Sequence, residues 1–357
     1  MRKIWYGSML IVMLVIAACT PTSPKEEVVV TEAVTQEAIK AEDIRIGYIV
    51  KTLGNTFWQT YQQGAEAAAA DLGVQIDVRD VPTEDDIKGQ LDVAMTMVNQ
   101  DYDAIVAASI TNTNLIPAIA EANKKGIPWI VVSEAQDEDV LAQNDAHTTA
   151  EVRLNFYDEG VIIGEYIADQ LGGSGQVGIV EGMAGTSAAR DRSQGVMDVF
   201  ADYPDIEVVA SQPGDWAREV ARDVAGAMIQ ANPEIDAIIA QNDTMALGVA
   251  VAVEQAGKKG EILVTGDDGT PEAYEAIKNG DLAATVDGVA WQIAYYSVYA
   301  AVKAVVENAD TLPNYDLKPN LVTIDNVEEV AAQMPKPPEY MFETNQNIYL
   351  PIPGITE

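Results

Sequence analysis

Two stretches of this chain repeat one pattern of short apolar runs and turns. In the first copy Gly47 and Gly64 are separated by 17 positions, and in the second copy Gly178 and Gly195 have the same separation. An Asp-Ala-Ile triplet begins a later apolar run in each copy. Because a repeat of this length is a supersecondary unit rather than a single element, the pattern predicts two similar lobes within one chain.

Both copies alternate apolar runs with Ala-rich helical stretches. The runs typical of buried strands are IRIGYIV, VQIDV, AIVAA and PWIVV in the first copy, and QVGIV, IEVVA, AIIA, EILVTG and AATVDG in the second. Strands that alternate with helices form parallel sheets covered by helices on both faces. We therefore predict an α/β fold with two similar Rossmann-like lobes. Since ligands bind at the carboxyl ends of such strands, we expect a cleft between the lobes.

The charge balance restricts the partners that the chain can have. The 357 residues include 21 Lys and Arg against 56 Asp and Glu, a formal net charge of −35. Phosphate binding requires a basic face, so we predict no nucleic-acid partner. The one histidine, His147, falls in a polar segment (QNDAHTTAEVRLN) that we interpret as a surface loop, and we predict no metal or other cofactor. No catalytic residue is assigned, although carboxylate chemistry of the glycosidase type stays open as an enzymatic alternative.

The N-terminus has the features of an export signal. Arg2 and Lys3 precede an apolar run from Met9 to Ala18, and the run ends in the sequence Ile-Ala-Ala-Cys. This ending resembles a bacterial lipobox, so we predict a signal peptide over residues 1–18 and a lipid on Cys19. Cys19 is the only cysteine, which excludes a disulfide within the chain. Residues 19–42 are rich in Thr, Pro and Glu and are interpreted as a flexible tether.

From Ile44 to about Asn326 the chain resembles the ribose-binding type of periplasmic binding protein, the solute receptors of ABC importers. The resemblance rests on six motifs in the same order: IGYIVKTLGNTFW, QGAEAAAADLGV, GTSAARDRSQG, IDAIIAQNDTMALG, VTGDDGTPEAYEAIKNG and LAATV. It implies two lobes that are joined by three hinge crossovers and close on a small molecule. The implied lobes comprise residues 43–155 with 289–320, and residues 156–288 with 321–357, the latter including a proline-rich tail.

The resemblance also implies ligand contacts from both lobes. The matching positions are Asn55, Phe57 and Trp58 in the first lobe, and Arg190, Trp216, Asn242 and Asp268 in the second. Aromatic faces can pack on the C–H face of a sugar, while amide, guanidinium and carboxylate groups can bond to its hydroxyls. Arg192 is interpreted instead as a surface residue or part of a structural ion pair. For Asn242, a purely structural role as a helix cap is the alternative.

Several positions depart from the family pattern. Ser133 and Glu134 stand where the family commonly has Asp-Arg, Ala108 replaces an asparagine, and a late glutamine of the family is replaced around Asp287. We count Ser133, Glu134 and Asp287 among the candidate ligand contacts. A cleft that has lost a cation and gained carboxylates argues against ribose itself. A neutral polyol or a different sugar is favoured, with an amine-bearing sugar or nucleoside as the alternative.

These features together predict a solute-binding lipoprotein of an ABC importer. The protein would be exported, anchored in the cell envelope through Cys19, and monomeric. It would bind a small sugar or polyol by closure of the hinge and deliver it to the membrane subunits of a permease. A receptor that presents its ligand to a membrane sensor is the alternative, because it would use the same cleft.

Overall fold

The computed structural model describes residues 39–332, 352 and 355–356. The predicted signal peptide, Cys19, most of the predicted tether and the prolines of the C-terminal tail lie outside the described residues. None of the helices in the described ranges combines the length and the apolar character that a membrane span requires.

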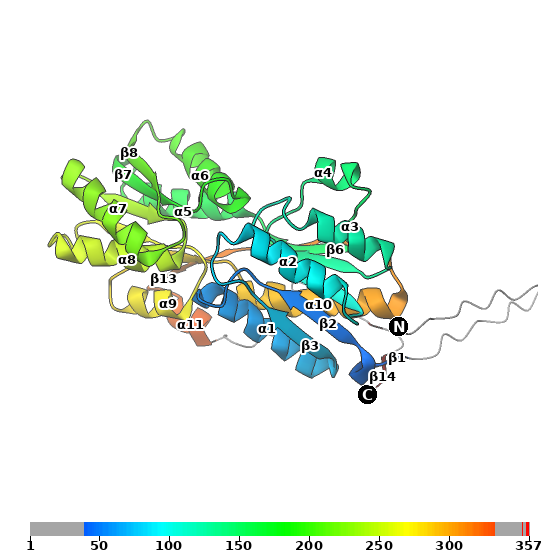
Figure 1. Cartoon of the computed structure of the whole chain (residues 1–357). Coiled ribbons are helices and arrows are strands. Elements are labelled where there is room, and N and C mark those ends of the chain that lie inside the picture. Colours follow the sequence, from blue (N-terminus) through cyan, green and yellow to red (C-terminus); the bar gives the residue numbers. More distant parts are fainter. Residues whose placement is uncertain (1–38, 333–351, 353–354, 357) are drawn as a thin grey trace, which may run out of the picture. The chain divides into compact units, whose positions relative to one another are not determined.

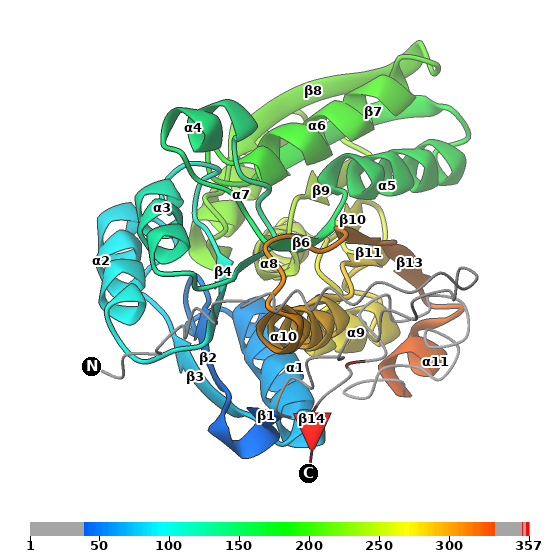
Figure 2. The same ribbon diagram turned by 90° about the vertical axis from the view of Figure 1, so that its right-hand side faces the viewer.

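Six parallel strands form the sheet of the first lobe, in the order β12-β6-β5-β4-β2-β3 (Figure 1). They are β2 (Arg45–Ile49), β3 (Gln75–Arg79), β4 (Ala104–Ala108), β5 (Trp129–Val132), β6 (Ala150–Leu154) and β12 (Tyr315–Leu317). The helices of this lobe are α1 (Thr56–Leu72), α2 (Ile87–Val98), α3 (Ile116–Lys124), α4 (Glu138–Gln143) and α10 (Ala290–Glu307). Helices α1 and α10 lie side by side over one face of the sheet (Figure 2), and α2 and α3 cover the other face.

The second lobe contains a similar sheet in the order β13-β11-β10-β9-β7-β8. Its strands are β7 (Ser174–Glu181), β8 (Asp205–Pro213), β9 (Ala237–Ala240), β10 (Leu263–Thr265), β11 (Ala284–Asp287) and β13 (Asn320–Thr323). Its helices are α5 (Phe156–Gln170), α6 (Ser187–Phe200), α7 (Arg218–Ala231), α8 (Asp243–Gln255), α9 (Pro271–Lys278) and α11 (Val327–Ala332). Helices α5 and α6 cover one face, whereas α7, α8 and α9 cover the other. The predicted two-lobed α/β fold is confirmed, with one antiparallel edge strand, β13.

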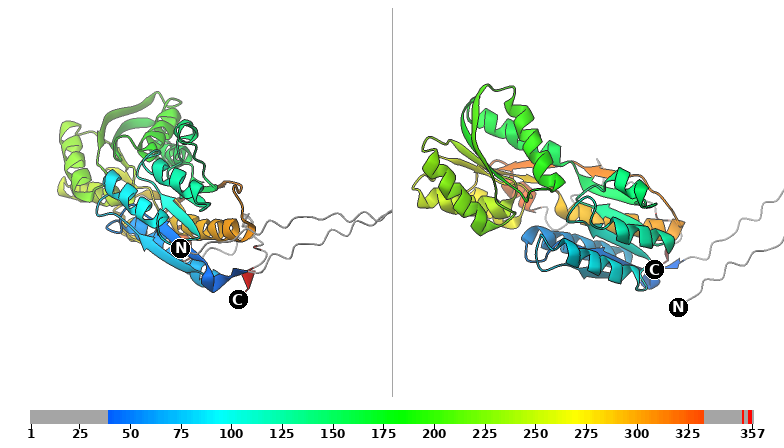
Figure 3. Two further views of the ribbon diagram at one scale, coloured as in Figure 1. Left: turned by 45° about the vertical axis from the view of Figure 1, so that its right-hand side comes forward. Right: turned by 45° about the horizontal axis from the view of Figure 1, so that its top comes forward.

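The chain passes between the two sheets three times within the described residues. It leaves the first sheet after β6, returns after β11 to form α10 and β12, and crosses again between β12 and β13 (Figure 3). Asn155 marks the first crossover, where its side chain accepts hydrogen bonds from the backbone of Tyr157 and Asp158 at the start of α5. Val289 marks the second crossover, with a positive φ of 45°.

Short polar side chains start most helices that follow the strands. In each case an oxygen of the side chain accepts a hydrogen bond from a backbone N–H in the first helical turn, which stabilises the helix end. These residues are Asn55, Asp86, Asp137, Asn155, Thr186, Asn242 and Thr270. Because each follows the carboxyl end of a strand, the same local signal that starts a helix places a polar group at one edge of a sheet.

The segment around His147 differs from its prediction as a surface loop. Residues 150–154 form β6, a strand inside the first sheet, and only the approach to that strand is a loop. The charged residues of β6 misled the interpretation: Arg153 pairs with Glu151 and, at 2.8 Å, with Asp316 of β12. These ion pairs give the charged side chains of β6 partners, so the strand can lie inside the sheet despite its polar sequence. The imidazole of His147 is partly exposed and lies 2.8 Å from Asp310.

Candidate functional site: the cleft between the lobes

A cavity lies between the carboxyl ends of the two sheets. It is lined by side chains from both lobes and from the first crossover: Lys51, Asn55, Phe57, Trp58, Glu84, Ser133, Phe156, Ala188, Arg192, Trp216, Asn242 and Asp268. Each of these residues lies in a turn after a strand or in the first turns of the following helix. The cavity is therefore where the carboxyl ends of parallel strands are expected to form a ligand site.

An aromatic cluster at the start of α1 forms the wall of the first lobe. The rings of Phe57 and Trp58 meet edge to face, with centroids 4.9 Å apart. Glu84, in the loop after β3, accepts a hydrogen bond from the Trp58 indole at 2.8 Å and another from the Asn55 amide at 3.3 Å. Since Asn55 also caps α1 through its oxygen, both ends of its amide are oriented. Burial raises the pKa of Glu84 above its ordinary value.

Lys51 supplies a cation to the same wall. Its ammonium lies 5.3 Å from the centre of the Trp58 ring and 3.5 Å from a carboxylate oxygen of Glu134. Both charged side chains are almost fully buried. A second oxygen of Glu134 accepts a hydrogen bond from Ser187, at the start of α6 in the other lobe. Glu134 therefore contacts a cation of the first lobe and a hydroxyl of the second.

Arg192 is the cation with which the second lobe lines the base of the inner cavity. Its guanidinium donates to Glu159 at 2.8 Å and to the Gln241 carbonyl at 2.7 Å, and it lies 2.9 Å from Asp267 and 3.7 Å from Asp268. Burial alone would lower the pKa of Arg192, but the neighbouring carboxylates raise it above its ordinary value. A planar guanidinium with several donors suits this shared role better than an ammonium. Arg192 is thus held rigidly beside the cavity.

Trp216 occupies a position that depends on a glycine. Its backbone has a positive φ of 60°, and its side chain packs against two hydrophobic clusters, one centred on each lobe. A Cβ atom on Gly182 would lie 1.9 Å from the Trp216 ring. Glycine at position 182 therefore leaves the space that the indole occupies. The Arg192 guanidinium lies 6.0 Å from the centre of this ring, so the aromatic group and the cation face the same region.

Asn242 and Asp268 complete the second wall. The Asn242 oxygen accepts a hydrogen bond from the Met245 backbone at 2.8 Å and so caps α8, while its side chain also lines the cavity. A role as helix cap and a role in contacting the ligand are therefore compatible for Asn242. Asp268 has a φ of 125°, a backbone conformation that side chains rarely adopt. Burial raises the pKa of its carboxyl well above the ordinary value. Such strain is typical of positions held for function.

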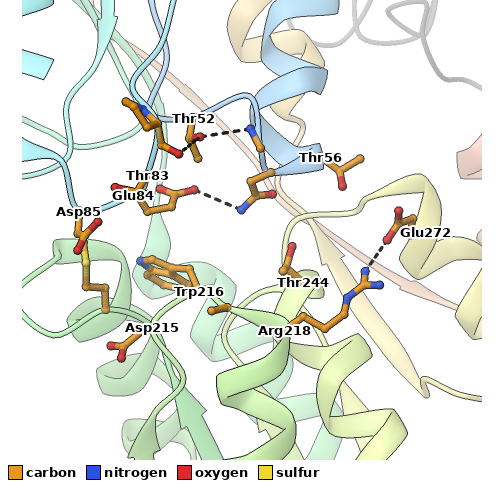
Figure 4. A pocket seen from close by; sticks show the side chains of 15 residues that line it. Thr52, Thr56, Thr83, Glu84, Asp85, Asp215, Trp216, Arg218, Thr244 and Glu272 are labelled. Atoms are coloured by element: carbon orange, nitrogen blue, oxygen red, sulfur yellow. Dashed lines mark hydrogen bonds and ion pairs between the residues drawn. The ribbon is translucent and has the colours of Figure 1, made fainter. Parts of the chain in front are cut away.

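An outer cavity of about 760 Å³ adjoins the inner one, whose volume is about 40 Å³. It shares Asn55, Glu84 and Trp216 with the inner cavity. Figure 4 looks into it, with Thr52, Thr56, Thr83 and Glu84 from the first lobe and Trp216, Arg218 and Thr244 from the second. Arg218 is paired with Glu272 at 2.6 Å. The outer cavity therefore adjoins the inner site, and most of its lining residues are polar.

The family model of the periplasmic binding protein domain matches residues 46–309, which include most of both lobes. The chain belongs to this family. The match confirms the resemblance stated from the sequence motifs.

Relatives and solved structures agree with this membership. The chain is 40% identical over 239 residues to the D-allose-binding periplasmic protein of Escherichia coli K12. The alignment covers 67% of this chain and 77% of that protein. It is 34% identical over 267 residues to the ribose import binding protein of Salmonella typhimurium LT2, covering 73% and 84%. A periplasmic solute-binding protein of an ABC transporter from Actinobacillus succinogenes 130z, solved with bound D-allose, has a TM-score of 0.77 at 30% identity, covering 80% and 99%. These relatives are binding proteins, and the chain is accordingly not an enzyme.

Most of the side chains predicted for the ligand site lie together. Seven of the ten line the inner cavity: Asn55, Phe57, Trp58, Ser133, Trp216, Asn242 and Asp268. Glu134 lies behind this lining, between Lys51 and Ser187. Asp287 is buried at the second crossover, where it accepts a hydrogen bond from the Val289 backbone at 2.8 Å. Burial raises the pKa of Asp287 to about 6.

The structure corrects the choice between the two arginines. The side chain of Arg190 is 67% exposed and pairs with its neighbour Asp191 at 2.7 Å. It lines another cavity, beside the crossovers, and not the inner one. Arg192 lines the inner cavity instead. Two positions along an α-helix correspond to a rotation of about 200°, so only one of the two can face the cleft. The interpretation of Arg192 as a surface residue was wrong, although it does form structural ion pairs.

Four further lining residues were missed. Lys51 follows β2 directly, which is a position that the strand pattern could have identified. Glu84 lies in a loop with several other acids, Phe156 begins α5, and Ala188 has no polar group. Their contribution depends on the folding of distant segments. Among residues 39–332, 352 and 355–356, no group of His, Cys, Asp or Glu side chains is arranged to hold a metal ion.

Proposed function

We propose that this protein is an extracytoplasmic solute-binding protein that takes up a neutral sugar or polyol for an ABC importer. One observation carries the proposal: aromatic rings of both lobes, Phe57 and Trp58 on one side and Trp216 on the other, line a cavity that also contains Asn55, Asn242, Arg192 and Asp268. Apolar faces with a few fixed polar groups are what a sugar ring requires, because it has C–H surfaces and a rim of hydroxyls.

The charges in the cavity favour an uncharged ligand. Two cations, Lys51 and Arg192, and two acidic groups, Glu84 and Asp268, are among the lining side chains. Carboxyl oxygens accept hydrogen bonds from hydroxyls, whereas the ammonium and guanidinium donate to hydroxyl oxygens. A polyol can use donors and acceptors of both kinds without bringing a charge into the cleft. D-allose is the first candidate, since a 40% identical relative and a 30% identical solved structure bind it.

Closure of the lobes provides the mechanism. A ligand that touches Trp58 in the first lobe and Trp216 in the second makes both contacts only while the lobes are together. Its differential affinity for that state therefore stabilises closure. The three crossovers are the segments about which the lobes can rotate. The closed form would then present the ligand to the membrane subunits of the permease.

Thermal melting against a panel of sugars tests the ligand class. Pentoses, hexoses, inositols, amino sugars and nucleosides would each be added to the full chain. A ligand at 100 times its dissociation constant adds about 2.7 kcal/mol of stability and raises the melting temperature by several degrees. We expect this shift with D-allose or a related neutral sugar. A shift confined to amine-bearing compounds would overturn the neutral class, and no shift with any compound would overturn sugar binding.

We also propose that Cys19 carries the lipid that anchors a monomeric receptor to the membrane. The apolar run and the small residues before Cys19 support this assignment. Expression of the full chain in a bacterial host should yield a membrane-bound product with an acylated N-terminal cysteine by mass spectrometry. The Cys19→Ser variant should be found in the soluble extracytoplasmic fraction or keep its signal peptide. An unmodified chain that reaches the membrane without an acyl group on Cys19 would contradict the anchor.

A further inference from the structure

A carboxylate bridge joins the two lobes behind the ligand cavity. The side chain of Glu134 is fully buried and approaches Lys51 of the first lobe at 3.5 Å. Its other oxygen accepts a hydrogen bond from the hydroxyl of Ser187 in the second lobe. Lys51 lines the inner cavity, whereas Glu134 does not. One carboxylate therefore connects a group that faces the ligand to a group on the opposite lobe.

The loop that carries Glu134 is held in a defined conformation. Ser133 has a positive φ of 69°, which turns the chain sharply at the end of β5. The Gln136 amide donates to the Glu134 carbonyl at 2.9 Å and to the Ser109 hydroxyl at 2.7 Å. These contacts come from the first lobe alone, so the loop keeps its position when the lobes separate. Glu134 is therefore already in position on the first lobe before the second lobe approaches it.

The partner on the second lobe suits a carboxylate. Ser187 is the first residue of α6, a helix of 14 residues capped by Thr186. Its hydroxyl donates to Glu134, and the positive end of the helix dipole adds a favourable interaction with the negative charge. Opening of the lobes removes both interactions from Glu134 and leaves Lys51 as its charged partner. The bond to Ser187 therefore belongs to the closed arrangement.

We propose that Glu134 is a positioning residue that couples the orientation of Lys51 in the ligand cavity to closure of the lobes. The part of this proposal that concerns the ligand rests on the proposed sugar-binding function. Glu134 holds the Lys51 ammonium beside the Trp58 ring, where it can donate to a sugar hydroxyl. By accepting from Ser187, the same carboxylate stabilises the closed state in which the ligand is retained. The principal effect is then on the rate of ligand dissociation.

Two serine variants form a matched test. Ser187→Ala removes the bond between the lobes, while Ser211→Ala removes a similar bond from Ser211 to Glu181 within the second lobe. Stopped-flow binding of D-allose to the full chain should show a roughly threefold to tenfold faster dissociation for Ser187→Ala, the effect of one hydrogen bond. Its association rate should be unchanged. Ser187→Thr should restore slow dissociation, and Ser211→Ala should behave as the unmodified chain.

A second measurement does not depend on any sugar. Labels attached through non-canonical residues at the exposed positions Lys88 in α2 and Glu207 in β8 report the distance between the lobes in the ligand-free chain. Ser187→Ala should shift the distances toward the open form, and it should add no further shift in a Glu134→Ala background. If no sugar binds the unmodified chain, the proposed sugar-binding function is rejected. The distances between the lobes then test the bond between Glu134 and Ser187 on their own. Identical distances and identical dissociation rates for Ser187→Ala and Ser211→Ala would overturn the coupling.

Discussion

Arg192 of α6 donates a hydrogen bond at 2.8 Å to Glu159 of α5, and both side chains are buried beneath the cleft. The two helices approach closely enough because glycines lie at their contact. A Cβ on Gly160 would be 2.2 Å from the Arg192 carbonyl, and one on Gly195 would be 2.3 Å from the Tyr157 carbonyl. The second glycine is the one whose spacing revealed the internal repeat. A packing requirement between helices thus also positions the guanidinium of the ligand cavity.

This arrangement predicts different outcomes for the two neighbouring arginines. Arg192→Lys should weaken sugar binding about 100-fold or more, because an ammonium cannot reach Glu159, Asp267 and the ligand together. It should also destabilise the fold, by less than the roughly 3–5 kcal/mol that loss of a buried partner costs, since one ammonium cannot pair with all the carboxylates around Arg192. Arg190→Lys, at an exposed position, is the control and should change neither property appreciably. Calorimetric titration and urea unfolding measure the two effects, and equal effects of the two variants would contradict the placement of Arg192.

Gly182 should affect sugar affinity indirectly, through the position of the Trp216 ring. In Gly182→Ala the new methyl group would collide with the Trp216 ring, so the indole must leave its place in the cavity. Affinity should fall at least tenfold, in the direction expected for Trp216→Ala. Gly226→Ala is the matched control, because a Cβ at that helical position in α7 meets no atom within 4 Å. Affinity equal to the unmodified chain in Gly182→Ala would show that Trp216 is not required.

Asp287 should make the stability of the fold depend on pH. Burial raises its pKa from 3.8 to about 6, so the folded protein binds this proton more tightly than the unfolded chain does. The contribution to stability is present below about pH 4 and is lost as the pH rises through about 6. The total is on the order of 3 kcal/mol.

Comparison with Asp287→Asn isolates this contribution. The variant keeps an oxygen that can accept from the Val289 backbone but has no carboxyl to titrate. Urea unfolding between pH 4 and pH 8 should show the unmodified chain losing stability relative to Asp287→Asn as the pH rises. Parallel stability curves would contradict the assignment of a raised pKa to Asp287.

Local patterns in the sequence were sufficient to predict most of the strands and the position of the cleft. The apolar runs from IRIGYIV to AATVDG correspond to β2–β5 and β7–β11. The central strands are apolar throughout because they are buried on both faces, whereas the edge strands β3 and β8 are more exposed and contain polar residues. Asn55 and Asn242 were identifiable for a related reason: a residue that caps the helix following a parallel strand lies at the edge where ligands bind. These properties are local, so one sequence reveals them.

The remaining features depend on contacts between distant segments. Arg190 and Arg192 differ only in their rotation about α6, and the acids that hold Arg192 come from α5 and from the turn after β10. The strand β6 was missed because Glu151 and Arg153 give it a polar sequence, yet they are paired with each other. Glu134 was predicted to contact the ligand, whereas its partners are Lys51 and, across the cleft, Ser187. Pairing of charges is a tertiary property, and the sequence alone does not identify the partners.

Calorimetric titration of D-allose into the full chain and into its Trp58→Ala and Trp216→Ala variants tests the central claim most directly. The two tryptophans lie on opposite lobes and line one cavity. We expect saturable binding of one sugar per chain, and a loss of affinity of at least tenfold in each variant, since both lobes must contact the ligand. Sugar binding that is unaffected by both substitutions, or the absence of binding to any neutral sugar, would contradict recognition in the cleft between the lobes.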